Sequence, residues 1–346
     1  MSRIAAIGGL DPAAYRRHSL HGDESAWPEK NCYIDVWIEL VHTLGFEPRA
    51  MLPFTLAVDF EGDQWTFFKP SPTDLRELYG IDVQELTVWR PLIEHAAEHL
   101  GAGKLISAEA DAFWLPDTAG TDYRNQHTKT TIVMAELDVD GRRLGYFHNG
   151  GYFQLAGEDF ARLFRLGAAP DPAFMPLFAE LVRVDRRVRR PERELAAMSY
   201  ALLRRHAGWR PPDNPFVRFA SRFERDLSQL RTRGLAHYHA WAFASVRQAG
   251  AAFELAASHL EWLAQLNHPG LRAAGESFNA ISQANKALIL KGARAVHTGK
   301  PLDATALVAA MAQAWDEGMA RIDDCLETDG PMPSTMDEDE GVRFGQ

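Results

Sequence analysis

A change of sequence character near residue 157 constrains this chain more than any other feature. Before it, β-branched and aromatic residues alternate with turn residues; after it, Ala, Arg, Leu and Glu dominate at helical spacing. Glycines and prolines between 157 and 176 indicate a connecting segment. The 346 residues suffice for two domains of ordinary size. We predict an α+β domain over 1–160, a helical domain over 161–327 and a disordered acidic tail over 328–346.

The first half combines an early helix with later antiparallel strands. Apolar residues recur at helical spacing over 32–44, and Asn31 is placed to cap that helix. The β-branched run Thr128–Leu137 predicts a long strand, Asp140-Gly141 a hairpin turn, and Arg143–His148 the returning strand. Helices followed by antiparallel strands are typical of an α+β domain.

The second half predicts helices throughout. We expect them at 173–186, 191–206, 215–230, 235–266, 273–297 and 303–326. Proline and glycine pairs separate most of these segments.

Composition excludes several classes of protein. The net charge of −10 argues against a general nucleic-acid binder, which needs a basic surface. No window holds the roughly 18 uninterrupted apolar residues of a membrane helix, so we expect no membrane partner. Two cysteines cannot form a disulfide framework, which favours a reducing cytoplasm as the location.

Cys32 is the main candidate for chemistry. It lies at the predicted N-terminus of a helix, where unpaired amide groups and the macrodipole favour a thiolate. At 100° per residue it points roughly away from the apolar stripe centred near Val41, whereas a packing cysteine would lie on that stripe. The alternative is an ordinary small core residue.

A thiolate nucleophile needs a base and a group that orients the base. His127 immediately precedes the predicted strand at 128, and a strand end is a rigid platform for a base. Asn149 ends the neighbouring strand, and antiparallel pairing would bring it beside His127. Cys32, His127 and Asn149 thus follow the papain-like order, although Asn149 also fits a turn.

Several motifs carry a resemblance to a known family. They are Asn31–Asp35, Asp59–Trp65 (DFEGDQW), Asp111–Pro116 (DAFWLP), Tyr123–Thr131 and Tyr146–Tyr152 (YFHNGGY). Through them nearly the whole chain resembles the bacterial family called domain of unknown function 1839. Residues 20–160 also resemble the papain-like domain of the butirosin-biosynthesis acyltransferase, in the Asn-Cys helix start, the D-x-x-x-L-P strand exit and the His127 position. That class implies transfer of an aminoacyl group from a carrier-protein thioester to an amine, through a Cys-His-acid site; here His148-Asn149 stands where an acid is expected.

Three functions follow from these residues. The first is a cysteine-dependent acyltransferase that takes an acyl group from a carrier-protein thioester and gives it to a small-molecule amine or thiol. The second is a carrier-protein or small-molecule binding protein without turnover. The third is a cysteine peptidase or amidase, disfavoured because no Gln lies just upstream of Cys32. Gln64 is a candidate oxyanion donor, and Asp63, Trp65 and His148 are candidate substrate contacts.

A metal site is the competing interpretation. His95, Glu98 and His99 match H-x-x-E-H, the spacing of some zinc hydrolases, but they equally suit the solvated face of a short helix. We therefore predict no metal and no cofactor.

Overall fold

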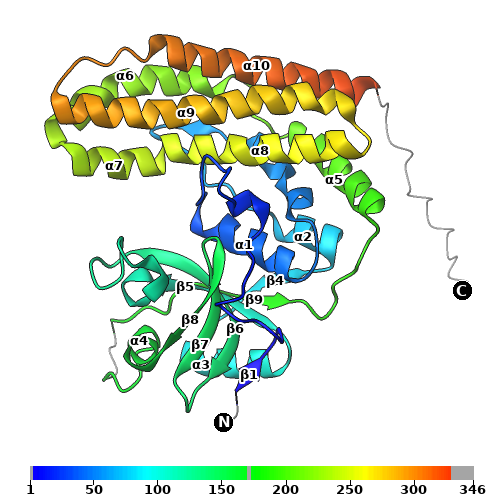
Figure 1. The fold of residues 1–346 in the computed structure, drawn as a ribbon, viewed down its shortest axis with the longest axis vertical. Coiled ribbons are helices and arrows are strands. Elements are labelled where there is room, and N and C mark those ends of the chain that lie inside the picture. The colour runs from blue at the N-terminus through cyan, green and yellow to red at the C-terminus, as the bar shows by residue number, and fades with distance from the viewer. Residues whose placement is uncertain (1–2, 170–172, 329–346) are drawn as a thin grey trace, which may run out of the picture.

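The computed structural model describes residues 3–169 and 173–328, as a sheet-bearing part and a helical part (Figure 1). The strands are β1 (Ile4–Ala5), β2 (Phe60–Glu61), β3 (Gln64–Trp65), β4 (Asp82–Glu85), β5 (Leu105–Asp111), β6 (Lys129–Asp138), β7 (Arg143–His148), β8 (Gly151–Ala156) and β9 (Ala179–Arg183). The helices of the first part are α1 (Cys32–Thr43), α2 (Pro72–Tyr79), α3 (Leu92–Gly101) and α4 (Gly157–Leu163), with short 3-10 helices η1 (Ser19–His21), η2 (Pro48–Ala57), η3 (Ala112–Trp114) and η4 (Pro116–Thr118).

Seven strands form one antiparallel sheet. Their order is β4-β9-β5-β6-β7-β8, and β1 pairs with the end of β6. The predicted hairpin is confirmed: β6 and β7 pair around the Asp140-Gly141 turn. The β-branched residues of β6 suit this central, doubly covered position. The prediction of an antiparallel α+β part followed by helices is confirmed at this level.

Alternation along the strands separates the two faces of the sheet. Helix α1 packs across β6 and β7 on the face that carries Thr131. Helices α3 and α4 cover the opposite face, which carries Ile132. Successive residues of a strand point to opposite faces, so residues 109, 111, 129 and 131 share the α1 face.

Strand β9 corrects one prediction. A helix was expected over 173–186, but 179–183 instead form β9, which lies between β4 and β5. The paired strands on both sides supply backbone hydrogen bonds that the local sequence does not reveal. The sheet-bearing part therefore extends to Arg183, beyond the expected end at 160.

Six helices make up the described helical part. They are α5 (Glu192–Ala207), α6 (Pro215–Arg233), α7 (Leu235–Ala244), α8 (Val246–Leu266), α9 (Arg272–Thr298) and α10 (Thr305–Thr328), with η5 (Pro269–Leu271). The helix expected over 235–266 breaks at Ser245, whose backbone is not helical. The predicted tail, 328–346, lies outside the described residues apart from Thr328.

Helix α1 lies between the sheet and the helical part (Figure 1). It is buried from Tyr33 to Val41, and Asp35 and Glu39 are as inaccessible as Ile34. The β2–β3 hairpin reaches the helical part through Trp65, which packs against Phe216 of α6. One contiguous apolar core runs through both parts.

Candidate functional site

Cys32 is the first residue of α1. Asn31 caps this helix, as predicted: its side-chain oxygen accepts the backbone N–H groups of Tyr33 and Ile34 at 3.1 and 3.0 Å. The Cys32 side chain is partly exposed, and its sulfur lies 3.6 Å from Oγ1 of Thr131 on β6. Amide dipoles at a helix N-terminus stabilise negative charge beside them. Cys32 is partly accessible and lies beside the backbone amide groups of a helix start.

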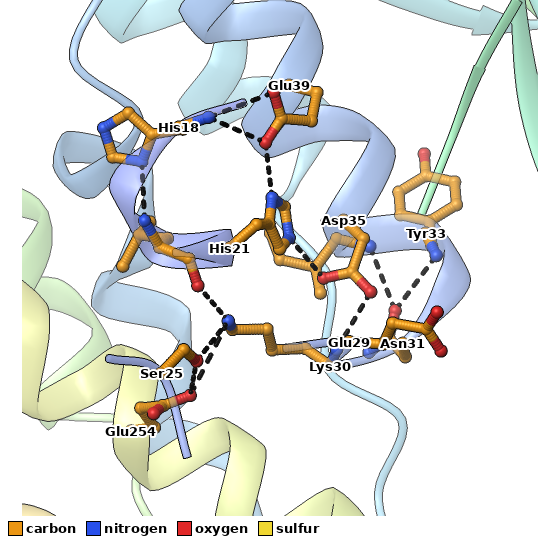
Figure 2. Close-up of polar contacts among 12 residues, drawn as sticks. His18, His21, Ser25, Glu29, Lys30, Asn31, Tyr33, Asp35, Glu39 and Glu254 are labelled. Atoms are coloured by element: carbon orange, nitrogen blue, oxygen red, sulfur yellow. Dashed lines mark hydrogen bonds and ion pairs between the residues drawn. The ribbon is translucent and has the colours of Figure 1, made fainter. Parts of the chain in front are cut away.

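A buried polar cluster fixes the chain that leads into α1 (Figure 2). We call His21, Lys30, Asp35, Glu39 and Glu254 the His21 cluster. The His21 ring lies between two carboxylates: Nδ1 contacts Glu39, and Nε2 is 2.9 Å from Oδ1 of Asp35. Lys30 donates its backbone N–H to Asp35 at 2.9 Å, and its Nζ lies 3.6 Å from Glu254 on α8. The cluster thus joins the segment before α1 to α1 itself and to the helical part.

Burial and charge pairing act in opposite directions on this cluster. Burial lowers the pKa of His21, but hydrogen bonds to Asp35 and Glu39 outweigh it and raise the pKa above its ordinary value. For Lys30 burial dominates and lowers the pKa, against the attraction of Asp35 and Glu254. His21, Lys30, Asp35 and Glu39 are each 0% exposed, so no substrate reaches them. We assign the cluster a structural role, which is to hold the N-terminus of α1 in place.

His127 lies beyond α1 at the start of β6. Its ring is largely exposed, stacks on Phe113 with 4.4 Å between ring centroids, and has Nδ1 2.6 Å from Oδ2 of Asp111. Asp111 ends β5 and opens the D-A-F-W-L-P motif, so pairing of β5 with β6 brings the two side chains together. The structure records a hydrogen bond from Cys32 to Thr131 and from the His127 ring to Asp111, and among the described residues none joins Cys32 to His127.

The sheet register corrects the expectation for Asn149. His148 pairs with Ile132, so Asn149 lies level with Thr131 rather than with His127. The four residue steps from 127 to 131 span about 13 Å of extended chain. Asn149 has a φ of 44° and forms the turn into β8. Asp111, not Asn149, therefore holds the His127 ring.

Two further polar groups on the α1 face were missed by sequence reasoning. Lys129, two positions before Thr131 on β6, donates a hydrogen bond to Glu109 at 3.0 Å. Tyr33 donates to both carboxylate oxygens of Glu180 at 3.0 Å. Burial raises the pKa of Glu180 against the effect of the Tyr33 hydrogen bond. Glu180 belongs to β9, the strand that was expected to be helical, so no local signal could have placed it here.

The predicted substrate contacts separate into different environments. Asp63 and Gln64 are exposed on the β2–β3 hairpin. Trp65 is buried against α6 and serves as a core residue, which corrects its expected role. His148 is buried on the sheet face opposite Cys32, with Nδ1 2.5 Å from Asp117 and Nε2 2.7 Å from Thr130. Both ring nitrogens of His148 are therefore occupied, and no substrate at Cys32 could reach it.

The H-x-x-E-H motif lies on α3. His95 and His99 are stacked with 6.3 Å between their rings, while Glu98 pairs with Arg90 instead of completing a ligand set. No group of three or more His, Cys, Asp or Glu side chains within 3–169 and 173–328 has the arrangement of a metal site.

The fold and this site define a two-part protein, in which an antiparallel α+β part carries an accessible helix-start thiol and a helical part anchors that helix. The chain belongs to the DUF1839 family: the DUF1839 N-terminal domain matches residues 16–184 and the DUF1839 C-terminal domain matches residues 192–324. The first of these spans ends just after β9. No curated protein matches the chain. No helix within the described part of the chain is long and apolar enough to cross a membrane.

Proposed function

We propose that this protein is a cysteine-dependent acyltransferase on a papain-like arrangement, with Cys32 as the nucleophile. The Cys32 thiolate attacks the carbonyl carbon of a carrier-protein thioester, a new C–S bond forms, and the carrier thiol leaves. An amine or thiol acceptor then attacks the acyl-Cys32 carbonyl and releases the Cys32 thiolate. His127, oriented by Asp111, accepts the proton of Cys32, gives it to the departing carrier thiol, and accepts the proton of the acceptor.

The observation that carries the proposal is the position of the Cys32 sulfur. It is partly exposed at the first residue of a 12-residue helix with a side-chain cap, and the His21 cluster holds that helix start rigidly. A thiol placed in this way is suited to nucleophilic attack. The backbone N–H of Cys32 provides one oxyanion donor.

The base must approach the thiol for turnover. His127 and Asp111 lie on the same sheet face as Thr131, and strand alternation directs all three toward the side that carries Cys32. Catalytic hydrogen bonds often tighten only when substrate is bound. The proposal therefore includes an approach of the segment around His127 toward α1 when the thioester binds.

A carrier protein fits one charged surface of the chain. Arg186 and Arg187 are exposed between β9 and α5, and Arg193 is exposed in the first turn of α5. Opposite charge steers association, so an acidic carrier protein suits this stretch.

The test is intact-protein mass spectrometry after incubation with an aminoacyl N-acetylcysteamine thioester. Wild type and Cys325→Ala, the matched control, should gain the mass of one acyl group, whereas Cys32→Ala should gain none. His127→Ala should slow acylation by about a hundredfold or more, the usual contribution of a general base. Asp111→Asn should slow it less, because that carboxylate only orients the ring. Equal acylation of Cys32→Ala and wild type would refute the mechanism.

One observation favours a second function, a binding protein of the same shape without turnover. The strand residue that contacts the Cys32 sulfur is Thr131, whose hydroxyl is not a base. In that case Cys32 should react with iodoacetamide only near or above pH 8, and His127→Ala should leave the reaction rate unchanged. Binding of the thioester without formation of acyl-Cys32 would support the binding protein over the acyltransferase.

A further inference from the structure

An apolar pocket lies on the sheet face opposite Cys32. We call it the sheet-face pocket; its volume is about 480 Å³, within the range of small-molecule sites. Ala110, Ile132 and Met134 form its floor on β5 and β6. Leu163 of α4 and Phe174 contribute to its wall. Strand alternation separates this floor from Thr131, so the pocket does not communicate with Cys32 through the sheet.

The pocket exposes much apolar surface. Trp89, Leu166, Phe174 and Leu177 line it and are 76%, 37%, 43% and 38% exposed. Large apolar side chains that gather around a concavity, instead of being scattered, mark a binding site. An apolar ligand body would remove this surface from water, which stabilises a complex by roughly 25 cal/mol for each Å² buried.

One corner of the pocket carries a guanidinium group. Arg90 and Leu92 line this corner, where α3 begins without a side-chain cap. Nε of Arg90 and Nε2 of His95 are both buried, and neither has a hydrogen-bond partner among the described residues. The His95 ring lies edge-on to Trp89, with 6.0 Å between centroids. The pocket lining at this corner thus comprises an uncapped helix start and a guanidinium, and the buried His95 ring lies behind Trp89.

The charges at this corner favour an anion. The Arg90 ion pair is with Glu98, whose side chain is 65% exposed, so exchanging that partner for a ligand costs little. Glu109 also lines the pocket, but strand alternation directs its carboxylate to the α1 face, where it is bonded to Lys129 and to the backbone N–H of Phe178. Arg165, also in the lining, adds positive charge above the Phe174 ring.

We propose that the sheet-face pocket binds a small apolar carboxylic acid. Its carboxylate lies at Arg90 and the N-terminus of α3, and its apolar body lies over Ala110, Ile132 and Met134. A helix start and a guanidinium both favour a carboxylate, and the guanidinium can bind it through two hydrogen bonds. At about 30 Å³ for each non-hydrogen atom, the pocket volume corresponds to roughly sixteen atoms, which is enough for such an acid.

The experiment compares 4-phenylbutyrate with its amide, 4-phenylbutanamide, by isothermal titration and by Trp fluorescence. The two probes have the same size and differ in charge. Wild type should bind the acid at least about tenfold tighter than the amide, a difference of about 1.4 kcal/mol. Arg90→Gln should abolish that difference while leaving the amide affinity unchanged. Trp89→Phe should remove most of the fluorescence change, whereas Trp209→Phe, at another exposed tryptophan, should not.

A second variant tests the location of the site. Leu163 is partly exposed, so the fold should persist when Leu163→Trp narrows the pocket. The variant should lower the affinity for both probes about tenfold or more. Leu235→Trp on α7 is the matched control and should bind normally. Cys32→Ala should also bind normally, which separates this site from the acyl-transfer proposal. Absence of saturable acid binding at about 10 mM, equal affinity for acid and amide, or unchanged binding by Leu163→Trp would overturn the proposal.

Discussion

Replacing His21 by glutamine tests the role assigned to the His21 cluster. The imidazole separates two buried carboxylates, Asp35 and Glu39, and hydrogen bonds to both raise its pKa. Glutamine has a similar reach, but both of its N–H donors lie on one nitrogen instead of on opposite sides of a ring, and it carries no charge. The variant therefore leaves two buried carboxylates without their shared cation.

The expected magnitude follows from the partners that remain. Removing one member of a buried ion pair costs about 3–5 kcal/mol. Asp35 keeps the Lys30 backbone N–H at 2.9 Å, and Glu39 keeps the Tyr15 hydroxyl at 2.6 Å and the His18 backbone N–H at 3.1 Å. We therefore expect a loss of stability at the lower end of this range, about 3 kcal/mol. An unfolding entropy of about 2.1 cal/mol/K per residue over 346 residues converts this into a Tm lower by about 4 °C.

The effect should depend on pH with a definite sign. His21 titrates at a higher pH in the native state than in the unfolded state, so it binds a proton more tightly when the protein is folded. Its contribution to the free energy of unfolding is full below about pH 6.5, the ordinary pKa of histidine, and is lost as pH rises through the raised native pKa. The stability difference between wild type and His21→Gln should therefore shrink above pH 6.5, by up to about 1.4 kcal/mol per pH unit.

The assay is urea denaturation of both proteins between pH 6 and pH 9. His297→Gln, at an exposed histidine near the end of α9, is the matched control and should stay within about 0.5 kcal/mol of wild type. A His21→Gln protein as stable as that control would refute the structural role of the cluster. A stability difference that is the same at pH 6 and pH 9 would refute the raised pKa.

Two more predictions follow from packing and burial. Gly250→Ala should destabilise the protein by about 1–3 kcal/mol in thermal melts, because a Cβ at this position would overlap the Trp27 indole. Gly101→Ala on α3 is the control: its Cβ would meet open space, so it should not lower the stability. Burial lowers the pKa of His18 and His259 to about 3, so both are neutral in the native state, and stability should fall between pH 6.5 and pH 3 as the unfolded chain gains these protons. A His259→Gln protein with the same acid dependence as wild type would contradict the second prediction.

Local sequence determined the elements whose signals are local. Asn31 caps α1 because its side chain needs only the two backbone N–H groups that follow it in the chain. The β6–β7 hairpin follows from a β-branched run, the Asp140-Gly141 turn signal and a returning strand, all within about 20 neighbouring residues. Most helices of the second half were found for the same reason, since apolar spacing along one segment predicts the face that it buries.

Tertiary structure decided which side chains meet. Strand β9 became a strand because two open sheet edges accept its backbone, and it brought Glu180 to Tyr33 from 147 residues away. The register of β6 with β5 gave His127 the Asp111 carboxylate, whereas the register of β6 with β7 kept Asn149 away from it. Such pairings depend on sheet order and register, which one sequence does not encode in any short window.

The burial of α1 shows the same division. Its Asp35 and Glu39 suit a solvated helix face when the helix is considered alone, because charged side chains ordinarily face water. In the folded chain the segment that precedes the helix covers that face: the His21 ring lies between the two carboxylates, and Lys30 donates its backbone N–H to Asp35. Local sequence determines where the helix starts and which residues it carries; only the packing of that segment against α1 decides that its charged face is buried.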